Sequence, residues 1–257
     1  MMREIYLFFT ALQFFTRVPI PKWVPYKAEY LQDSRKYFPF IGILLGAVTC
    51  LFFYVSKQVF SVEIAILISM LSSIFITGAF HEDGLADTFD AFGGGYTPEK
   101  ILTIMKDSRI GTYGTVAVIL SLALKFFFLK SIYLEGDYQF YCSLILGHSL
   151  SRFLASTMVD LLPYVQDLDI SKSKPIANTK FAIGQFIPGL IFGLWPLVFF
   201  RDQLVFLILF PSIAFALYLG WYFRRKIGGY TGDCLGATQQ MTEIVIYASL
   251  VVLWKFI

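Results

Sequence analysis

Charged residues are scarce in this chain: Asp, Glu, Lys and Arg make up 15% of its 257 residues, whereas hydrophobic residues make up 57%. Soluble globular domains carry about 25% charged residues. No stretch between the apolar runs is long enough to bury a core of its own. The composition therefore excludes a separate soluble domain and predicts a single integral membrane domain over residues 1–257, with the lipid bilayer as its surroundings.

The chain has few cysteines and a small net charge. The three cysteines, Cys50, Cys142 and Cys234, form no CxxC pair, and the first two lie in apolar runs, where cysteine usually behaves as a small hydrophobic residue. The formal net charge is only +3, and the charges are scattered. A nucleic-acid partner requires a basic patch, so that class is excluded. The sequence leaves the oligomeric state open, a homo-oligomer included.

Long apolar runs dominate the chain. A helix needs about 20 apolar residues to cross a bilayer, and the candidate runs are 37–58, 62–80, 114–134, 140–159, 181–200, 204–223 and 243–257. They predict an all-α membrane bundle of about seven transmembrane helices. Residues 5–20 are apolar but interrupted by Arg17 and ended by Pro19. We expect them to form a short helix that lies on the bilayer, with a short span as the alternative.

Lysine and arginine favour one side of this bundle. Thirteen of them fall in the connections 21–36, 81–113, 160–180 and 224–242, against three in the connections that contain Lys57, Lys130 and Arg201. Cytoplasmic loops carry the excess of positive charge. The first set is therefore predicted to face the cytoplasm, and it contains both polar motifs of the chain.

The polar stretch 81–114 holds the strongest functional signal. Asp83, Asp87 and Asp90 stand four and three residues apart, so their carboxylates share one face if the segment is helical. Mg²⁺ takes hard oxygen ligands and usually shares them with substrate phosphates. The stripe predicts a magnesium site, with a solvated acidic helix face as the alternative.

Cationic and glycine-rich segments follow this stripe. Lys106 and Arg109 suit an anionic oxygen cluster, since arginine supplies a bidentate fork and lysine a point charge. Gly93 and Gly94, with the glycine that follows, let backbone N–H groups approach a phosphate closely, as in anion nests. A plain turn explains these glycines equally well.

A second polar cluster occupies residues 228–243. Asp233, Gln240 and Glu243 keep helical spacing, so they are placed to face the first acidic stripe across the bundle. Thr231 or Asp233 also fits the N-cap of a helix. A capped helix start explains this Thr-Gly-Asp sequence almost as well as a functional role.

Histidine and arginine contribute three further candidates. Arg152 lies inside the run 140–159, where a charged side chain must face the bundle interior or the membrane surface. It is a candidate phosphate contact or partner to an acid, with a structural ion pair as the alternative. His148 is more simply an interior histidine. His81 is a candidate base or ligand ranked below the aspartates, since a helix-end histidine is the simpler account.

These groups indicate one kind of chemistry. Acids suited to Mg²⁺, cations suited to phosphate and the lack of an evident Ser, Cys or His nucleophile point to phosphoryl transfer by positioning and electrostatics. A cytoplasmic site suits a soluble nucleotide as leaving group. The spacing of the motifs does not identify the acceptor.

Four segments, spread over nearly the whole chain, carry a resemblance to a known family. They are ALQFFTRVP at 11–19, HEDGLAD at 81–87, IMKDSRIGTYG at 104–114 and TGDCLGA at 231–237. With these segments in this order, the chain resembles the cobalamin synthases, also called adenosylcobinamide-GDP ribazoletransferases. The resemblance implies a multi-pass enzyme of the cytoplasmic (inner) membrane that acts with Mg²⁺ in the assembly of the cobalamin lower ligand.

The resemblance also implies a reaction and a set of site residues. The ribose hydroxyl of α-ribazole, or of its 5′-phosphate, attacks the cobinamide-proximal phosphorus of adenosylcobinamide-GDP, and GMP leaves. The predicted residues are Asp83, Asp87, Lys106, Asp107 and Arg109 for catalysis, His81, Gly93, Gly94, Ser108, Arg152 and Thr231 for substrate binding, and Asp83, Asp87, Asp90, Glu82, Asp233 and Glu243 for metal binding. Two positions depart from the family pattern. Glu82 adds a further ligand candidate, and Gln240 puts metal binding at its position in doubt.

Two rival functions have different sequence requirements. A CDP-alcohol phosphotransferase also uses spaced aspartates in a membrane bundle, but its signature is Asp-Gly-x-x-Ala-Arg, whereas Leu85-Ala86-Asp87 follows directly here. A cation transporter would place acids at mid-span and at both faces of the membrane. The clustering of the acids at one face favours the cobalamin reading over both.

Overall fold

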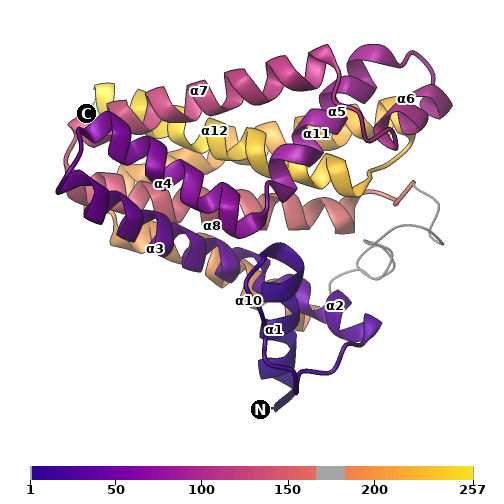
Figure 1. Ribbon diagram of the computed structural model, residues 1–257, viewed down its shortest axis with the longest axis horizontal. Helices are drawn as coiled ribbons and strands as arrows, with labels where there is room; N and C mark the ends of the chain where they lie inside the picture. The colour runs from indigo at the N-terminus through magenta and orange to yellow at the C-terminus, as the bar shows by residue number, and fades with distance from the viewer. Residues whose placement is uncertain (1, 166–182, 257) are drawn as a thin grey trace.

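Helices make up almost all of the described chain, which comprises residues 2–165 and 183–256 of a computed structural model. The long helices α3 (Phe38–Lys57), α4 (Val62–Thr77), α7 (Thr112–Leu134), α8 (Asp137–Leu161) and α12 (Gly232–Phe256) run side by side along the longest axis (Figure 1). The all-α prediction is therefore confirmed. Part of the connection 160–180, with Lys172, Lys174 and Lys180, lies outside the described residues.

Helix α8 forms the centre of the bundle. It packs against α3, α12, α10 (Ile183–Leu194) and α7, and 17 of its 25 residues are buried. Those buried residues include Ser149, Ser151 and Arg152 beside the expected hydrophobic side chains. The centre of this fold is thus partly polar, which is possible in a membrane bundle only where the polar groups face one another.

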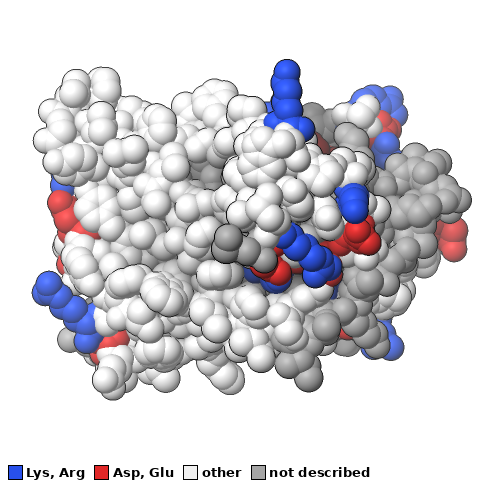
Figure 2. Space-filling view, turned by 90° about the horizontal axis from the view of Figure 1, so that it is seen from below, with Lys and Arg blue, Asp and Glu red and all other residues white. Residues whose placement is uncertain are grey.

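A broad uncharged band lies on the face of the bundle that Figure 2 draws. Figure 2 shows charged side chains toward the two ends and a broad uncharged band between them. At the end where α3 and α7 finish, Lys57 pairs with Asp137 at 2.5 Å and Lys130 pairs with Glu63 at 2.9 Å. Large hydrophobic side chains are exposed on the outer helix faces. This pattern is that of a membrane protein, since hydrocarbon tolerates exposed apolar side chains and excludes charged ones.

The predicted count of about seven spans is not confirmed. Among the described residues, three helical stretches are long and apolar enough to cross a bilayer: Ala28–Lys57, Thr112–Leu134 and Gln203–Ile227. Helix α4 together with α5 (Phe80–Gly94) passes the same test as a fourth, broken span. Helices α8 and α12 have 25 residues each, but their interior polar side chains lower their hydropathy. Helix α10 has only 12 residues and contains Pro188.

The N-terminal helices cross one end of the bundle. Helix α1 (Met2–Phe15) and helix α2 (Ala28–Ser34) lie there, and η1 (Arg35–Tyr37) connects them to α3 (Figure 1). Aromatic side chains of α1 pack on α3, with the rings of Phe15 and Phe38 stacked at 3.8 Å. A bilayer surface position for α1 stays a prediction.

A sharp turn at Gly78 and Ala79 separates α4 from α5. Both residues have positive φ, 68° and 58°, and the axes of the two helices differ by 87°. Glycine adopts this conformation without a steric penalty, and the side chain of Arg17 occupies the space beside Gly78. The predicted span 62–80 therefore ends early, and α5 turns away from the apolar direction of α4.

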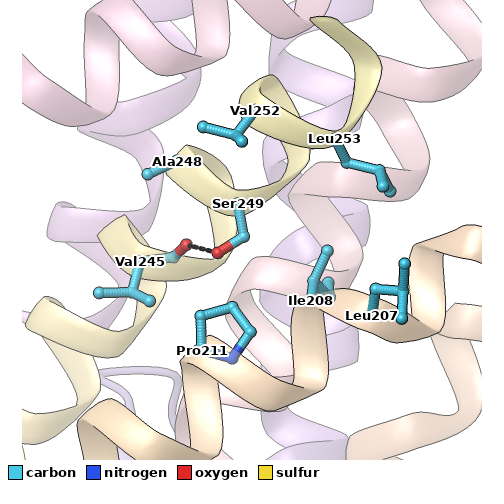
Figure 3. Close-up of a pocket in the computed structure, with 8 residues that line it drawn as sticks. All are labelled: Leu207, Ile208, Pro211, Val245, Ala248, Ser249, Val252 and Leu253. Carbon is cyan, nitrogen blue, oxygen red and sulfur yellow. Dashed lines mark hydrogen bonds between the residues drawn. The ribbon is translucent and has the colours of Figure 1, made fainter. Parts of the chain in front are cut away.

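The remaining elements complete the two ends. They are α6 (Pro98–Met105), η2 (Trp195–Phe199), η3 (Gln203–Ile208) and α11 (Leu209–Ile227). A groove of about 410 Å³ lies between η3, the start of α11 and the later turns of α12 (Figure 3). Its one hydroxyl, on Ser249, donates to the carbonyl of Val245 at 2.6 Å. This groove offers apolar contact only, so the polar site must be sought elsewhere.

Candidate active site

The acidic stripe of α5 meets the start of α12 at a close helix crossing. A Cβ atom on Gly84 would lie 3.0 Å from the carbonyl oxygen of Asp233, and one on Gly236 would lie 3.3 Å from Cα of Gly84. Only glycines allow two helix backbones to approach this closely. The crossing places Asp233 next to the helix that carries Asp83 and Asp87, although about 150 residues separate them in sequence.

The carboxylates at this crossing influence one another. Both α5 and the first turn of α12 lie outside the three continuous apolar stretches. Burial, followed by the negative charges of Asp233, Asp83 and Asp90, raises the pKa of Asp87 to about 7. Burial, with a smaller contribution from Asp83, raises the pKa of Asp233 to about 6. Asp83, Asp87 and Asp233 therefore form one coupled acidic group, as the helical spacing of the sequence predicts.

This acidic group has the charge and the oxygen donors that a divalent cation requires. Asp83 is exposed, whereas Asp87 and Asp233 are half-buried. Within the described ranges, no three His, Cys, Asp or Glu side chains converge closely enough to hold a metal ion. The donor chemistry fits Mg²⁺, and side-chain rotation is needed to close the ligands around it.

Asp90 is held by the start of α7. Its two carboxylate oxygens accept hydrogen bonds from the backbone N–H groups of Gly111, at 2.6 Å, and Gly114, at 2.8 Å. A carboxylate at the N-terminus of a helix satisfies unpaired amides and the helix dipole. Asp90 thus fixes α7 against α5, and its predicted role as a metal ligand stays a prediction.

The cationic segment follows α6, which packs against α5. Arg109 donates through Nη2 to Oδ2 of Asp107 at 2.6 Å, and this bond lowers the pKa of Asp107 to about 2. The Arg109 side chain is 87% exposed, and Lys106 and Ser108 are exposed beside it. The segment therefore presents positive charge to solvent after a helix that packs on α5, with one guanidinium already oriented.

The glycine run ends α5. Gly93 and Gly94 are the last residues of this helix, and the N–H of Gly95 donates to the carbonyl of Ala91. A Cβ on Gly93 would lie 2.6 Å from the ring of Tyr113. The glycines therefore end a helix and leave space for that ring, and their predicted contact with a phosphate stays a prediction.

Glu82 and Glu243 belong to a different polar group inside the bundle, and their predicted place among the metal ligands stays a prediction. Glu243 pairs with Lys125 of α7 at 3.3 Å and accepts from Gln239 at 2.6 Å. Gln240 accepts from Lys125 at 2.7 Å and donates to Glu82 at 2.9 Å. Helical rotation along α12 therefore sends Asp233 toward the acidic group and Glu243 toward Lys125.

Arg152 is enclosed by the bundle, and its predicted role as a substrate contact stays a prediction. It is 2% exposed, and Nη1 donates to the carbonyl of His148 at 2.9 Å and lies 3.2 Å from Nδ1 of that ring. His81 is also 2% exposed and stacks on Phe38 at 5.8 Å. Its Nε2 has no hydrogen-bond partner among the described residues. Its substrate contact stays a prediction.

Thr231 serves the start of α12. Its side chain is fully buried, and Oγ1 accepts from the N–H of Cys234 at 3.3 Å. This is the N-cap that the sequence offers as an alternative. Thr231 thus orients the turn that carries Asp233, and its predicted substrate contact stays a prediction.

Sequence reasoning missed two features near this site. Lys125 was detectable as a lone cation inside an apolar run, a rare position that usually marks a function or a buried partner. Thr88 and the aromatic side chains around it carry no comparable signal, because aromatic residues are common throughout this chain. Only the packing of α5, α7 and α11 brings them together.

The fold and the site define an all-α membrane protein with a coupled acidic group and a cationic segment at one end of the bundle. Residues 7–251 match the family model described as cobalamin-5-phosphate synthase. The chain is 42% identical over 246 residues to the adenosylcobinamide-GDP ribazoletransferase of Shewanella frigidimarina, covering 96% of this chain and 94% of the relative. It is 41% identical over 250 residues to that of Shewanella oneidensis, covering 97% and 95%. No solved structure was found to match.

The chain therefore belongs to the cobalamin-5-phosphate synthase family, also known as the adenosylcobinamide-GDP ribazoletransferases. The match extends over α1 to α12, so it includes both helices that carry the acidic group. This membership confirms the resemblance found in the sequence motifs. It favours that reading over the CDP-alcohol phosphotransferase and cation-transporter alternatives.

Proposed function

We propose that this chain transfers the cobinamide phosphoryl group of adenosylcobinamide-GDP to α-ribazole or to its 5′-phosphate. A ribose hydroxyl oxygen of the acceptor bonds to the cobinamide-proximal phosphorus, the phosphoanhydride bond to GMP breaks, and the hydroxyl proton leaves. Adenosylcobalamin, or its 5′-phosphate, and GMP are the products. The similarity to named ribazoletransferases over nearly the full length is the observation that carries this proposal.

The coupled acidic group supplies the place for a cation. Asp83, Asp87 and Asp233 would hold Mg²⁺, because their mutual repulsion falls when a divalent cation neutralises it. The bound ion would neutralise charge on the diphosphate during transfer. The chain's own contribution is to hold these carboxylates on two helices fixed at the Gly84–Gly236 crossing.

The cationic segment would orient the diphosphate. Arg109 is held by Asp107, so its guanidinium loses less conformational freedom on binding a phosphate. Lys106 and Arg109 are both exposed and accessible to a soluble substrate. Phosphate contacts from such residues position the reacting phosphorus for in-line attack.

We further propose that the site faces the cytoplasm at the inner membrane. The thirteen-to-three distribution of Lys and Arg supports this orientation. Lys57 and Lys130 lie at the end of the bundle opposite to the α5–α12 crossing. A cytoplasmic site gives direct access to a nucleotide-linked substrate and releases GMP into water.

The reaction is tested with the purified protein in liposomes. Adenosylcobinamide-GDP, α-ribazole and Mg²⁺ are supplied together, and GMP and the corrinoid product are quantified by chromatography. We expect equimolar GMP and adenosylcobalamin, dependent on both the acceptor and Mg²⁺. GMP formed at the same rate without α-ribazole would indicate hydrolysis and contradict transfer. Consumption of CDP-diacylglycerol instead of adenosylcobinamide-GDP would contradict the substrate assignment.

Mg²⁺ binding is expected to weaken as the pH falls through 7. Mg²⁺ requires ionised carboxylates, and Asp87, with a pKa of about 7, takes up a proton below that pH. Each pH unit below 7 then lowers the apparent affinity by about tenfold for this one group. The Mg²⁺ concentration for half-maximal activity, measured from pH 5.5 to 8.5, should rise toward acid and stay constant above pH 8. A flat profile would remove Asp87 from the ligand set.

A further inference from the structure

An aromatic cavity lies beside the acidic stripe on α5. Its volume is about 290 Å³, and it is bounded by α5, α7, α11 and α12. Six rings surround it: Phe89, Phe92, Tyr113, Tyr218, Tyr222 and Phe223. No charged residue is among the described residues that line it. The cavity is therefore suited to a flat, largely apolar molecule that stacks against aromatic rings.

The aromatic rings that line this cavity pack against one another. The ring of Phe92 lies 5.3 Å from that of Tyr222 and 5.7 Å from that of Phe223. Gly93 lines the cavity and, having no side chain, leaves room for the ring of Tyr113. Rings contributed by α5, α7 and α11 thus face one space without filling it.

One polar group in this cavity lacks a partner. Thr88 is only 5% exposed, and its Oγ1 makes no hydrogen bond within the described part of the chain. The helical threonines Thr238 and Thr242 instead donate to carbonyls four residues earlier, at 2.8 and 2.6 Å. A buried hydroxyl without a partner costs about 1–3 kcal/mol. Thr88 lines the cavity, and rotation of its side chain would bring this hydroxyl to a ligand bound there.

We propose that this cavity binds the base of the acceptor nucleoside, a two-ring benzimidazole, and that Thr88 donates to its free ring nitrogen. The inference rests on the proposed function, because it assigns a place to that acceptor. A cavity of about 150 Å³ accepts benzene, so the present one has room for two fused rings. A benzimidazole has apolar faces and edges and a single free nitrogen acceptor, which matches one hydroxyl among aromatic rings.

The position of the cavity suits a ribose that must reach the acidic group. Thr88 directly follows Asp87, and Asp90 lies between Phe89 and Phe92 on the same helix. One helical turn rises about 5.4 Å, so a ribose attached to a base in the cavity lies within about one turn of the carboxylates. The guanine of the donor fits the cavity less well, because its several donors and acceptors would be left unpaired among aromatic rings.

The inference is tested by measuring KM for α-ribazole and KM for adenosylcobinamide-GDP separately in two cavity variants. Thr88→Val keeps the shape of the side chain and removes the hydroxyl, and we expect KM for α-ribazole to rise about three- to tenfold. Tyr222→Leu removes one stacking ring from a different helix, and we expect a rise of about fivefold to a hundredfold. KM for adenosylcobinamide-GDP should stay at its wild-type value in both. Equilibrium binding of α-ribazole to each variant in nanodiscs, without the donor, should weaken by the same factors.

Ser249→Ala is the matched control, since it removes a hydroxyl from the groove of Figure 3 and should change neither constant. Wild-type binding of α-ribazole by both cavity variants would overturn the inference, and so would an equal rise in KM for the donor. Loss of co-purified lipid with unchanged α-ribazole binding would assign the cavity to an acyl chain instead. A wild-type protein that binds no α-ribazole and releases no GMP would refute the proposed function itself. Should Thr88→Val fail to fold, Tyr222→Leu still decides the matter.

Discussion

Asp87→Asn is expected to abolish GMP release while leaving the protein folded. Asp87 is central to the acidic group, because its pKa responds to Asp233, Asp83 and Asp90 together. Under the proposed function Asp87 would hold Mg²⁺, and removal of such a ligand would forfeit charge stabilisation worth several kcal/mol, which corresponds to a loss of about a thousandfold or more in kcat. Single-turnover assays at saturating substrates and increasing Mg²⁺ measure this loss. Activity near the wild-type level with unchanged Mg²⁺ dependence would contradict the assignment.

Asp87→Asn should lower activity but should not lower the stability of the folded protein. The folded state disfavours the ionised form of Asp87, so its charge opposes folding above pH 7 and has no effect below the usual carboxyl range near pH 4. In Mg²⁺-free detergent at pH 8, the melting temperature of Asp87→Asn should equal or exceed that of the wild type. Asp202→Asn provides the control, because asparagine can replace Asp202 as the N-cap of η3. It should retain full activity.

The acidic stripe was predictable because helical periodicity acts over short distances. Asp83 and Asp87 stand four residues apart, and one turn of helix suffices to place them on one face. The start of α12 at Thr231 was likewise given by local N-cap chemistry. Such local features depend on neighbouring residues alone, so the sequence contains the information directly.

The polar group inside the bundle, which contains Glu82 and Glu243, could not be predicted from the sequence because it depends on helix packing. Glu82 stands next to Asp83 in sequence, yet it turns toward Gln240 inside the bundle. Its partner depends on how α12 rotates against α5, which the Gly84–Gly236 contact fixes across about 150 residues. A spacing rule could not decide which acids face the site and which face Lys125.

The turn between α4 and α5 illustrates the same limit for span prediction. Hydropathy continues smoothly to residue 80, but Gly78 and Ala79 redirect the chain by 87°. The turn is stabilised by Arg17, which follows α1 and is distant in sequence, and whose backbone N–H donates to the carbonyl of Ile76 at 2.7 Å. Without this turn, α5 would continue into the apolar layer and the acidic stripe would face lipid.

Lys125→Met is expected to cause a large loss of stability. Lys125 and Glu243 have side chains that are 8% and 3% exposed, and their charges neutralise each other at 3.3 Å. Removing one partner of a buried pair leaves an uncompensated charge and costs about 3–5 kcal/mol. Chemical denaturation in detergent measures this change. Lys130→Met, on the same helix, breaks a pair that is about half exposed and should cost about 1 kcal/mol or less.

The double variant Lys125→Met with Glu243→Gln separates an ion pair from a metal site. If the two side chains serve each other, the second substitution removes the unpaired charge and restores most of the stability lost in Lys125→Met. The sequence instead suggests that Glu243 binds Mg²⁺. In that case Glu243→Gln would raise the Mg²⁺ requirement strongly and would not rescue Lys125→Met. We expect rescue with an unchanged Mg²⁺ requirement, because the side chains that contact the Glu243 carboxylate lie inside the bundle: Lys125, His148, Gln239 and Tyr247.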